Sequence, residues 1–181
     1  MLLNGVHLLP DASGALIWPA RQLLAVASPP AAMAAQAVRR LAALARQRRP
    51  RVIVWMGEAP IALPDREQRE WDRLQAEHEW IACEDEIQLS PLTFRLQAGA
   101  ATKAGEIIAR PNPLARYDGQ VWPAFVIDGR RLALPAFGPT GGGTEVMSTA
   151  FLSLFRRPFQ ALMLVNGRIV TRPRARLENP S

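Results

Sequence analysis

The chain has 181 residues, of which 49% are hydrophobic and 21% are charged, and its formal net charge is +6. A chain of this length can bury most of its apolar surface without disulfides or a structural metal. No apolar run reaches the roughly 20 residues that a membrane-spanning helix needs, so a protein that crosses the membrane with a helix is excluded.

We expect one domain over residues 1–176, followed by a disordered tail over residues 177–181. Cys83 is the single cysteine, which excludes an internal disulfide. The amino-terminal segment has neither the basic region nor the cleavage site of an export signal. These features together predict a cytoplasmic protein without membrane contacts.

The first half of the chain predicts strands that alternate with helices. Short apolar runs bounded by proline are typical of buried strands, and an alanine-rich segment with apolar residues at helical spacing predicts a helix. A strand, helix and strand in succession favour a parallel right-handed unit, with functional residues after the carboxyl ends of the strands. The expected elements are a hairpin over 15–18 and 23–27, a helix over 31–47, a strand over 51–56, a helix capped by Asp65 and running to about His78, and a strand over 81–83.

The second half is predicted to be rich in β-strands, because its short apolar runs are interrupted by glycine and proline. Asp128-Gly129 and Asn166-Gly167 are dipeptides typical of hairpin turns. One further helix is expected near residues 145–154. The expected strands cover residues 92–96, 106–109, 121–127, 131–134, 161–165 and 169–170.

The most specific pattern in the sequence is LPAFG at 134–138, followed by TGG at 140–142. Two earlier segments, WPAR at 18–21 and MGE at 56–58, accompany it. In this order the three segments resemble the DNA-ligase-associated branch of the calcineurin-like metallophosphoesterases. The resemblance implies an α/β sandwich, in which two mixed β-sheets pack face to face and are flanked by helices. It also implies a DNA-repair context with a helicase or a ligase as a neighbour.

The resemblance further implies a two-metal site, which in that family is built from Asp-x-His, Gly-Asp, Gly-Asn-His-Asp and Gly-His-x-His segments at loop tips. This chain has SPP at 28–30, GE at 57–58 and ARPN at 109–112 in three of these places, and no counterpart of Gly-Asn-His-Asp. His7 and His78 are its only histidines. We therefore predict no bound metal, no cofactor and no catalytic residue. The degenerate positions of the former metal site are Ser28, Pro30, Glu58, Arg110 and Asn112.

Arg110 and Glu58 follow neighbouring strands in this alignment, so we expect them on the same rim of the molecule. A guanidinium at this place either supplies the positive charge that a metal would have carried or forms a salt bridge that plugs the cleft. Finding the two residues on opposite faces would invalidate the alignment.

Other catalytic classes find no support in the sequence. The glycine-rich segment at 138–144 lacks the lysine and the spacing of a phosphate-binding loop. Cys83 has no nearby histidine that could activate it, and no G-x-S-x-G pattern indicates a serine nucleophile. We interpret the glycine-rich segment as a turn and Cys83 as an inert core residue.

The basic residues are unevenly distributed, and arginine supplies almost all of the positive charge. The segment 39–51 contains six arginines and no acidic residue, which makes it a candidate surface for anions or nucleic acid. Aromatic residues that could stack on bases are absent from it, and a solvated helix face is the alternative interpretation. The candidate anion-binding residues are Arg39, Arg40, Arg46, Arg48, Arg49 and Arg110.

Three functions follow as hypotheses. The first is a catalytically inactive metallophosphoesterase homologue that acts as a binding or structural partner in DNA repair, with a protein such as a helicase or ligase as its unidentified partner. The second is a weak or altered metal-dependent phosphoesterase or nuclease that uses Glu58, Asn112 and Ser28. The third is a nucleic-acid-binding module that uses its arginine clusters.

Overall fold

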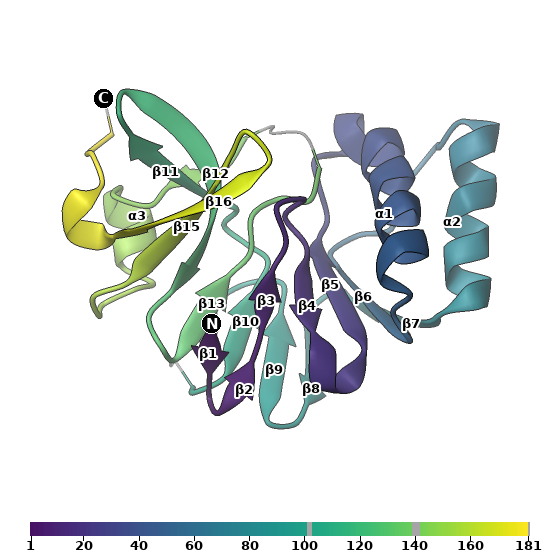
Figure 1. Ribbon diagram of the computed structural model, residues 1–181, viewed down its shortest axis with the longest axis horizontal. Helices are drawn as coiled ribbons and strands as arrows, with labels where there is room; N and C mark the ends of the chain where they lie inside the picture. The colour runs from purple at the N-terminus through teal and green to yellow at the C-terminus, as the bar shows by residue number, and fades with distance from the viewer. Residues whose placement is uncertain (101–102, 139–141, 181) are drawn as a thin grey trace.

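Two β-sheets pack face to face, and helices cover the outer surface (Figure 1). The computed structural model describes residues 1–100, 103–138 and 142–180. The main core lies between the two sheets and contains residues of both, for example Ala25 and Val54 of the first sheet and Phe94 and Phe125 of the second. The α/β sandwich of two mixed sheets that the sequence predicted is confirmed.

The first sheet has five strands in the order β3-β4-β5-β6-β7. Strands β5, β6 and β7 are parallel, whereas β3 and β4 run antiparallel to their neighbours. Every residue of β5 and β6 is buried, because one face of the sheet packs on the second sheet and the other on helices. The strands are β3 (Leu9–Pro10), β4 (Leu16–Trp18), β5 (Leu23–Ala27), β6 (Val52–Met56) and β7 (Glu79–Cys83).

Two helices, α1 (Ala34–Arg48) and α2 (Asp65–Glu77), lie side by side on the outer face of the first sheet (Figure 1). Helix α1 follows a 3-10 turn, Ala31–Met33, and buries its small alanine and branched side chains against the sheet. Three tryptophans, Trp71 of α2 and Trp55 and Trp80 of the first sheet, pack together with ring centroids 4.6 to 6.3 Å apart. Asp65 does not cap α2 as expected, since it is the first helical residue and its side chain makes no cap hydrogen bond.

The second sheet has nine strands in the order β14-β11-β12-β13-β10-β9-β8, with β15 paired to β12 and β16 to β15. Strand β10 is parallel to both of its neighbours, β9 and β13, and the long strand β12 pairs antiparallel with three partners. The strands are β8 (Glu86–Leu89), β9 (Leu92–Arg95), β10 (Glu106–Ile108), β11 (Pro113–Tyr117), β12 (Gln120–Ile127), β13 (Arg131–Ala133), β14 (Thr144–Glu145), β15 (Gln160–Val165) and β16 (Arg168–Pro173).

The short elements complete the chain. A small hairpin of β1 (Leu2–Leu3) and β2 (Val6–His7) begins it, and 3-10 turns cover Pro19–Arg21 and Arg174–Arg176. Helix α3 (Thr149–Leu152) is shorter than the helix expected over 145–154, because β14 takes the start of that segment and the Ser148 hydroxyl caps α3 at the Phe151 backbone N–H.

The expected turns are present. Asp128 Oδ1 accepts hydrogen bonds from the backbone N–H groups of Arg130 and Arg131 between β12 and β13. Asn166 and Gly167 both have a positive φ, which the tight turn between β15 and β16 requires.

Near the carboxyl end of the chain, Leu177 packs against a separate apolar cluster of the second sheet and α3, which contains Phe151 and Phe155. The Glu178 backbone N–H donates to the Arg116 carbonyl, and the Glu178 carboxylate accepts from the Gly119 backbone N–H. The domain boundary at residue 176 stays a prediction. Among the described residues, no helix has the length and apolar character needed to span a membrane.

Candidate functional site

The residues that follow the parallel strands of both sheets meet at one edge of the sandwich, which we call the rim. The two sheets are joined there, since Ala27 at the end of β5 forms a parallel bridge with Ala136 and accepts a hydrogen bond of 3.0 Å from the Phe137 backbone N–H. The LPAFG segment therefore connects β13 of the second sheet to β5 of the first. Its TGG continuation includes residues 140 and 141, which lie outside the described residues.

Backbone contacts continue the rim from one strand end to the next. The Ser28 N–H donates to the Met56 carbonyl over 2.8 Å, which ties the end of β5 to the end of β6. Across the sheets, a methyl group placed on Gly57 would lie 3.7 Å from the Leu96 side chain. The Leu96 carbonyl in turn accepts a 2.8 Å hydrogen bond from the Arg110 backbone N–H. Positions 28, 57, 96 and 110 thus follow one another along a single edge.

Only glycine fits at position 57 without strain. Its φ of +125° is a conformation that side chains rarely adopt, and a Cβ atom there would overlap the Ser28 hydroxyl. The next residue, Glu58, is exposed, and its carbonyl accepts a 2.8 Å hydrogen bond from the Trp55 indole. Pro30 is exposed as well, at the start of the segment that leads into α1.

Arg110 and Asn112 lie on the other side of the rim. The Arg110 side chain is exposed, and the Arg110–Pro111 peptide bond is cis. Both residues line a cleft of about 560 Å³, together with Gln97 and Leu154. Asn112 is half-buried, and its Oδ1 has no hydrogen-bond partner among the described residues. No ion pair between Glu58 and Arg110 is present in the described part of the chain.

The rim does not offer a ligand set for two metal ions. The predicted metal-site positions present the hydroxyl of Ser28, the carboxylate of Glu58, the guanidinium of Arg110 and the amide of Asn112. Across residues 1–100, 103–138 and 142–180, no group of three or more His, Cys, Asp and Glu side chains is close enough to hold a metal ion. Neither histidine belongs to the rim, since His7 is in β2 and His78 binds the Pro50 carbonyl at 2.7 Å beyond α2. Residues of this kind do not fit a binuclear hydrolase centre.

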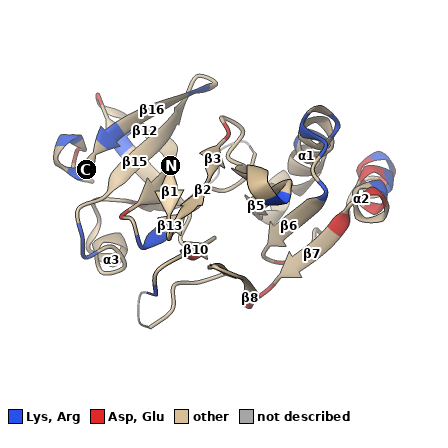
Figure 2. Cartoon of the chain, turned by 60° about the horizontal axis from the view of Figure 1, so that its bottom comes forward, with Lys and Arg blue, Asp and Glu red and all other residues tan. Residues whose placement is uncertain are grey.

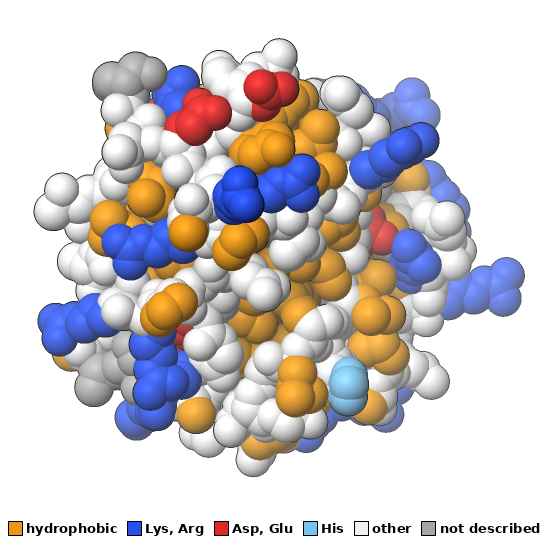
Figure 3. Space-filling model, turned by 60° about the vertical axis from the view of Figure 1, so that its left-hand side comes forward, with side chains coloured by type: hydrophobic (Ala, Val, Ile, Leu, Met, Phe, Trp, Pro, Cys, Tyr) orange, Lys and Arg blue, Asp and Glu red, His pale blue; other side chains and the backbone are white. Residues whose placement is uncertain are grey.

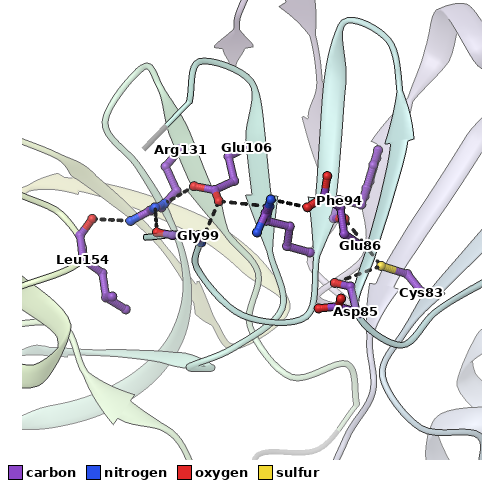
Figure 4. Close-up of polar contacts among 9 residues, drawn as sticks. Cys83, Asp85, Glu86, Phe94, Gly99, Glu106, Arg131 and Leu154 are labelled. Atoms are coloured by element: carbon purple, nitrogen blue, oxygen red, sulfur yellow. Dashed lines mark hydrogen bonds and ion pairs between the residues drawn. The ribbon is translucent and has the colours of Figure 1, made fainter. Parts of the chain in front are cut away.

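A buried ion-pair network, which the sequence did not reveal, lies within the second sheet (Figure 4). Arg131 Nε donates to Glu106 Oε2 over 2.5 Å, and both side chains are 2% exposed. The network continues through Arg95, which lies 3.6 Å from Glu106 and also pairs with Glu86. Glu106 and Arg131 are opposite each other in the parallel pair β10–β13. Their only sequence signal is a charged residue at the start of each of two apolar runs.

Three of the four arginines of helix α1 form ion pairs with acidic residues in the described part of the chain, and α1 lies beside α2, which carries acidic residues (Figure 2). Arg39 pairs with Glu67 at 2.6 Å, and Arg46 pairs with Glu70 at 3.3 Å, so α2 neutralises part of the basic face of α1. The hydrogen bond from Arg39 holds the pKa of Glu67 below its ordinary value.

Beyond the pairs with α2, Arg48 pairs with Asp11 at 2.8 Å. Arg40 and Arg49 are exposed and make no side-chain hydrogen bond or ion pair with the described residues. Of the predicted anion-binding residues, Arg40, Arg49 and Arg110 are therefore the ones whose side chains contact no described acidic residue.

Cys83 ends β7 beneath the rim and is fully buried. Its Sγ lies 3.6 Å from the Phe94 carbonyl, which accepts its hydrogen bond. Burial raises the pKa of the thiol to about 11, so the thiolate needed for nucleophilic chemistry is suppressed at neutral pH.

Comparison with known proteins finds a protein of similar structure but no sequence family. No family model matches the chain, and no curated protein matches it. The structure is similar to the crystal structure of Pseudomonas putida nuclease MPE, with a TM-score of 0.70. The match covers 95% of this chain and 98% of that chain. The two sequences are 20% identical, so the likeness concerns the fold, and it is consistent with a metallophosphoesterase-like sandwich.

Proposed function

We propose that this chain is a metallophosphoesterase-like protein that binds a partner and does not hydrolyse phosphoesters. The observation that carries the proposal is the set of side chains at the rim. A binuclear centre needs several carboxylate and imidazole ligands that bridge two ions and lower the pKa of the attacking water. Among the predicted metal-site positions, Glu58 supplies the one carboxylate, and the cationic Arg110 would repel a metal ion at the same edge.

The partner belongs to the proposal as well. The resemblance to ligase-associated phosphoesterases, and the fold shared with a protein described as a nuclease, support a place in DNA repair with a helicase or ligase as the protein partner. Nucleic acid is the second candidate ligand, and it is favoured by Arg40, Arg49 and Arg110. Their side chains are exposed and contact no described acidic residue. Weak or altered hydrolysis through Glu58, Asn112 and Ser28 is the competing function.

Metal analysis and a hydrolysis assay separate binding from catalysis. We expect the purified protein to contain no stoichiometric transition metal and to show no turnover of a phosphodiester substrate in added manganese. Glu58→Ala should then behave as the wild type does. Glu84→Ala is the matched control, because Glu84 is an exposed glutamate that follows the neighbouring strand β7. Stoichiometric metal, together with turnover that Glu58→Ala abolishes and Glu84→Ala preserves, would establish the enzyme instead.

A further inference from the structure

A second cleft adjoins the rim cleft on the outer side of the second sheet. It has a volume of about 660 Å³ and lies between residues 98–100 and residues 153–157. The two clefts share Ala98 and Leu154 as lining residues, so they are neighbours, and Arg110 lines the rim cleft. We call the second one the arginine cleft. Its charged lining residues are Asp128, Arg130, Arg131, Arg156 and Arg157.

Arg131 holds the two walls of the arginine cleft in place (Figure 4). Its Nη1 donates to the Leu154 carbonyl on one wall over 2.6 Å, and its Nη2 donates to the Gly99 carbonyl on the other over 3.3 Å. Glu106 strengthens the second wall, because its Oε1 accepts a 2.9 Å hydrogen bond from the Gly99 backbone N–H. The opening of the cleft is therefore set by a buried ion pair and does not need to be organised by a ligand.

The electrostatic balance of the cleft is positive. The carboxylate of Asp128 is engaged by backbone N–H groups, and the charge of Arg131 is compensated by Glu106. Arg156 and Arg157 are exposed, and their side chains make no hydrogen bond or ion pair with the described residues. The face formed by the carboxyl-terminal half likewise carries many Lys and Arg side chains and few acidic ones (Figure 3).

The position of Arg156 and Arg157 is fixed by their neighbour in the sequence. Phe155 is fully buried and stacks on Phe151 with ring centroids 5.0 Å apart, and both belong to the core on the outer face of the second sheet. The two guanidinium groups therefore extend from an anchored backbone. Planar guanidinium donors match the oxygens of a phosphate group with paired hydrogen bonds.

From these observations we propose that the arginine cleft is a binding site for a phosphate group, with Arg156 and Arg157 as its principal ligands. The volume is that of a small-molecule site. The phosphate is carried either by a small molecule or by the backbone of a single-stranded nucleic acid that continues toward Arg110. The site goes beyond the proposed function, because it lies outside the rim and binds its ligand whether or not the rim hydrolyses phosphoesters.

Two probes and two double variants test the site in the full chain. The probes are pyrophosphate, followed by calorimetry, and a fluorescent oligothymidine of about 12 nucleotides, followed by anisotropy. Arg156→Gln/Arg157→Gln removes the two ligands at exposed positions. Arg66→Gln/Arg69→Gln removes the same charge from exposed positions on α2 and is the matched control. Equal thermal unfolding midpoints of the three proteins verify that folding is unchanged.

The expected result is that the wild type binds at least one probe and that the cleft variant weakens this binding at least about tenfold, since a hydrogen bond to a charged group is worth roughly that factor. The control variant should retain it. Binding of pyrophosphate alone assigns a small phosphate ligand, and binding of the oligonucleotide alone assigns a nucleic-acid backbone. The proposal is overturned if neither probe binds, or if the control variant weakens binding as much as the cleft variant does.

Discussion

The Glu106–Arg131 pair offers the sharpest test of how the second sheet is held together. Glu106→Gln keeps the size of the side chain but removes the charge that compensates a guanidinium only 2% exposed. The amide oxygen of the substituted side chain can still accept the Gly99 N–H, so the loss is chiefly electrostatic. Breaking a buried pair from one side costs about 3–5 kcal/mol. This is a large share of the roughly 5–15 kcal/mol by which a domain is stable.

Urea unfolding at neutral pH measures this loss, and a double-mutant cycle assigns it to the pair. Arg131→Met should also be strongly destabilising. The double variant should lose less free energy of unfolding than the two single variants lose together, because it leaves no buried charge without a partner. Glu145→Gln is the control. It breaks the Arg116–Glu145 pair, whose side chains are 20% and 24% exposed, and should cost only about 0.2–1 kcal/mol. Losses from Glu106→Gln as small as those of the control, or strict additivity in the cycle, would refute the reasoning.

Three further predictions follow. Gly57→Ala should cost more than about 1 kcal/mol in the same titration because of its φ of +125° and the overlap with Ser28, while Gly129→Ala, with open space around it, should cost less. Cys83, whose pKa burial raises to about 11, should react with a thiol reagent only after unfolding, and rapid reaction of the native protein would contradict this. Glu67→Gln should lower the free energy of unfolding at neutral pH and leave it unchanged in acid. The pKa of Glu67 is held below 4.5, so its carboxylate stabilises the fold above that pH, and this contribution is lost as the pH falls through the native pKa. A loss of stability that persists in acid would count against the ion pair with α1.

The elements that the sequence predicted best are those with the strongest burial. Strands β5 and β6 are apolar along their whole length because both faces of the first sheet are covered, and this produces an unmistakable run of hydrophobic residues. Helix α1 is equally clear, since seven of its side chains are buried at helical spacing. Local composition is sufficient where each residue of an element has the same environment.

The elements that the sequence missed depend on partners that are distant in the chain. Strands β8 and β11 alternate between more exposed and more buried residues and contain charged side chains, so no apolar run marks them. The helix expected over 145–154 is shortened because Glu145 pairs with Arg116 and residues 144–145 join β11 as a strand. Tertiary contacts override local helix propensity here.

The residues of the candidate site and its surroundings also differ in how far the sequence could locate them. The order of strands places Ser28, Glu58 and Arg110 after the carboxyl ends of β5, β6 and β10, and their role as a former metal site stays a prediction. The Glu106–Arg131 pair escaped prediction because a charged residue beside an apolar run is normally solvated. Only the register of β10 against β13 places the two charges together in the core.

The connections that hold the rim together are independent of the side chains that the rim presents. The strand ends are joined by backbone hydrogen bonds, from Phe137 to Ala27 and from Arg110 to Leu96, and these do not depend on the side chains presented at the edge. The main core lies below the rim and is apolar. Exposed side chains at the rim can therefore differ without loss of these strand connections, while Arg131 and Glu106 hold the two walls of the neighbouring arginine cleft through hydrogen bonds to Leu154 and Gly99.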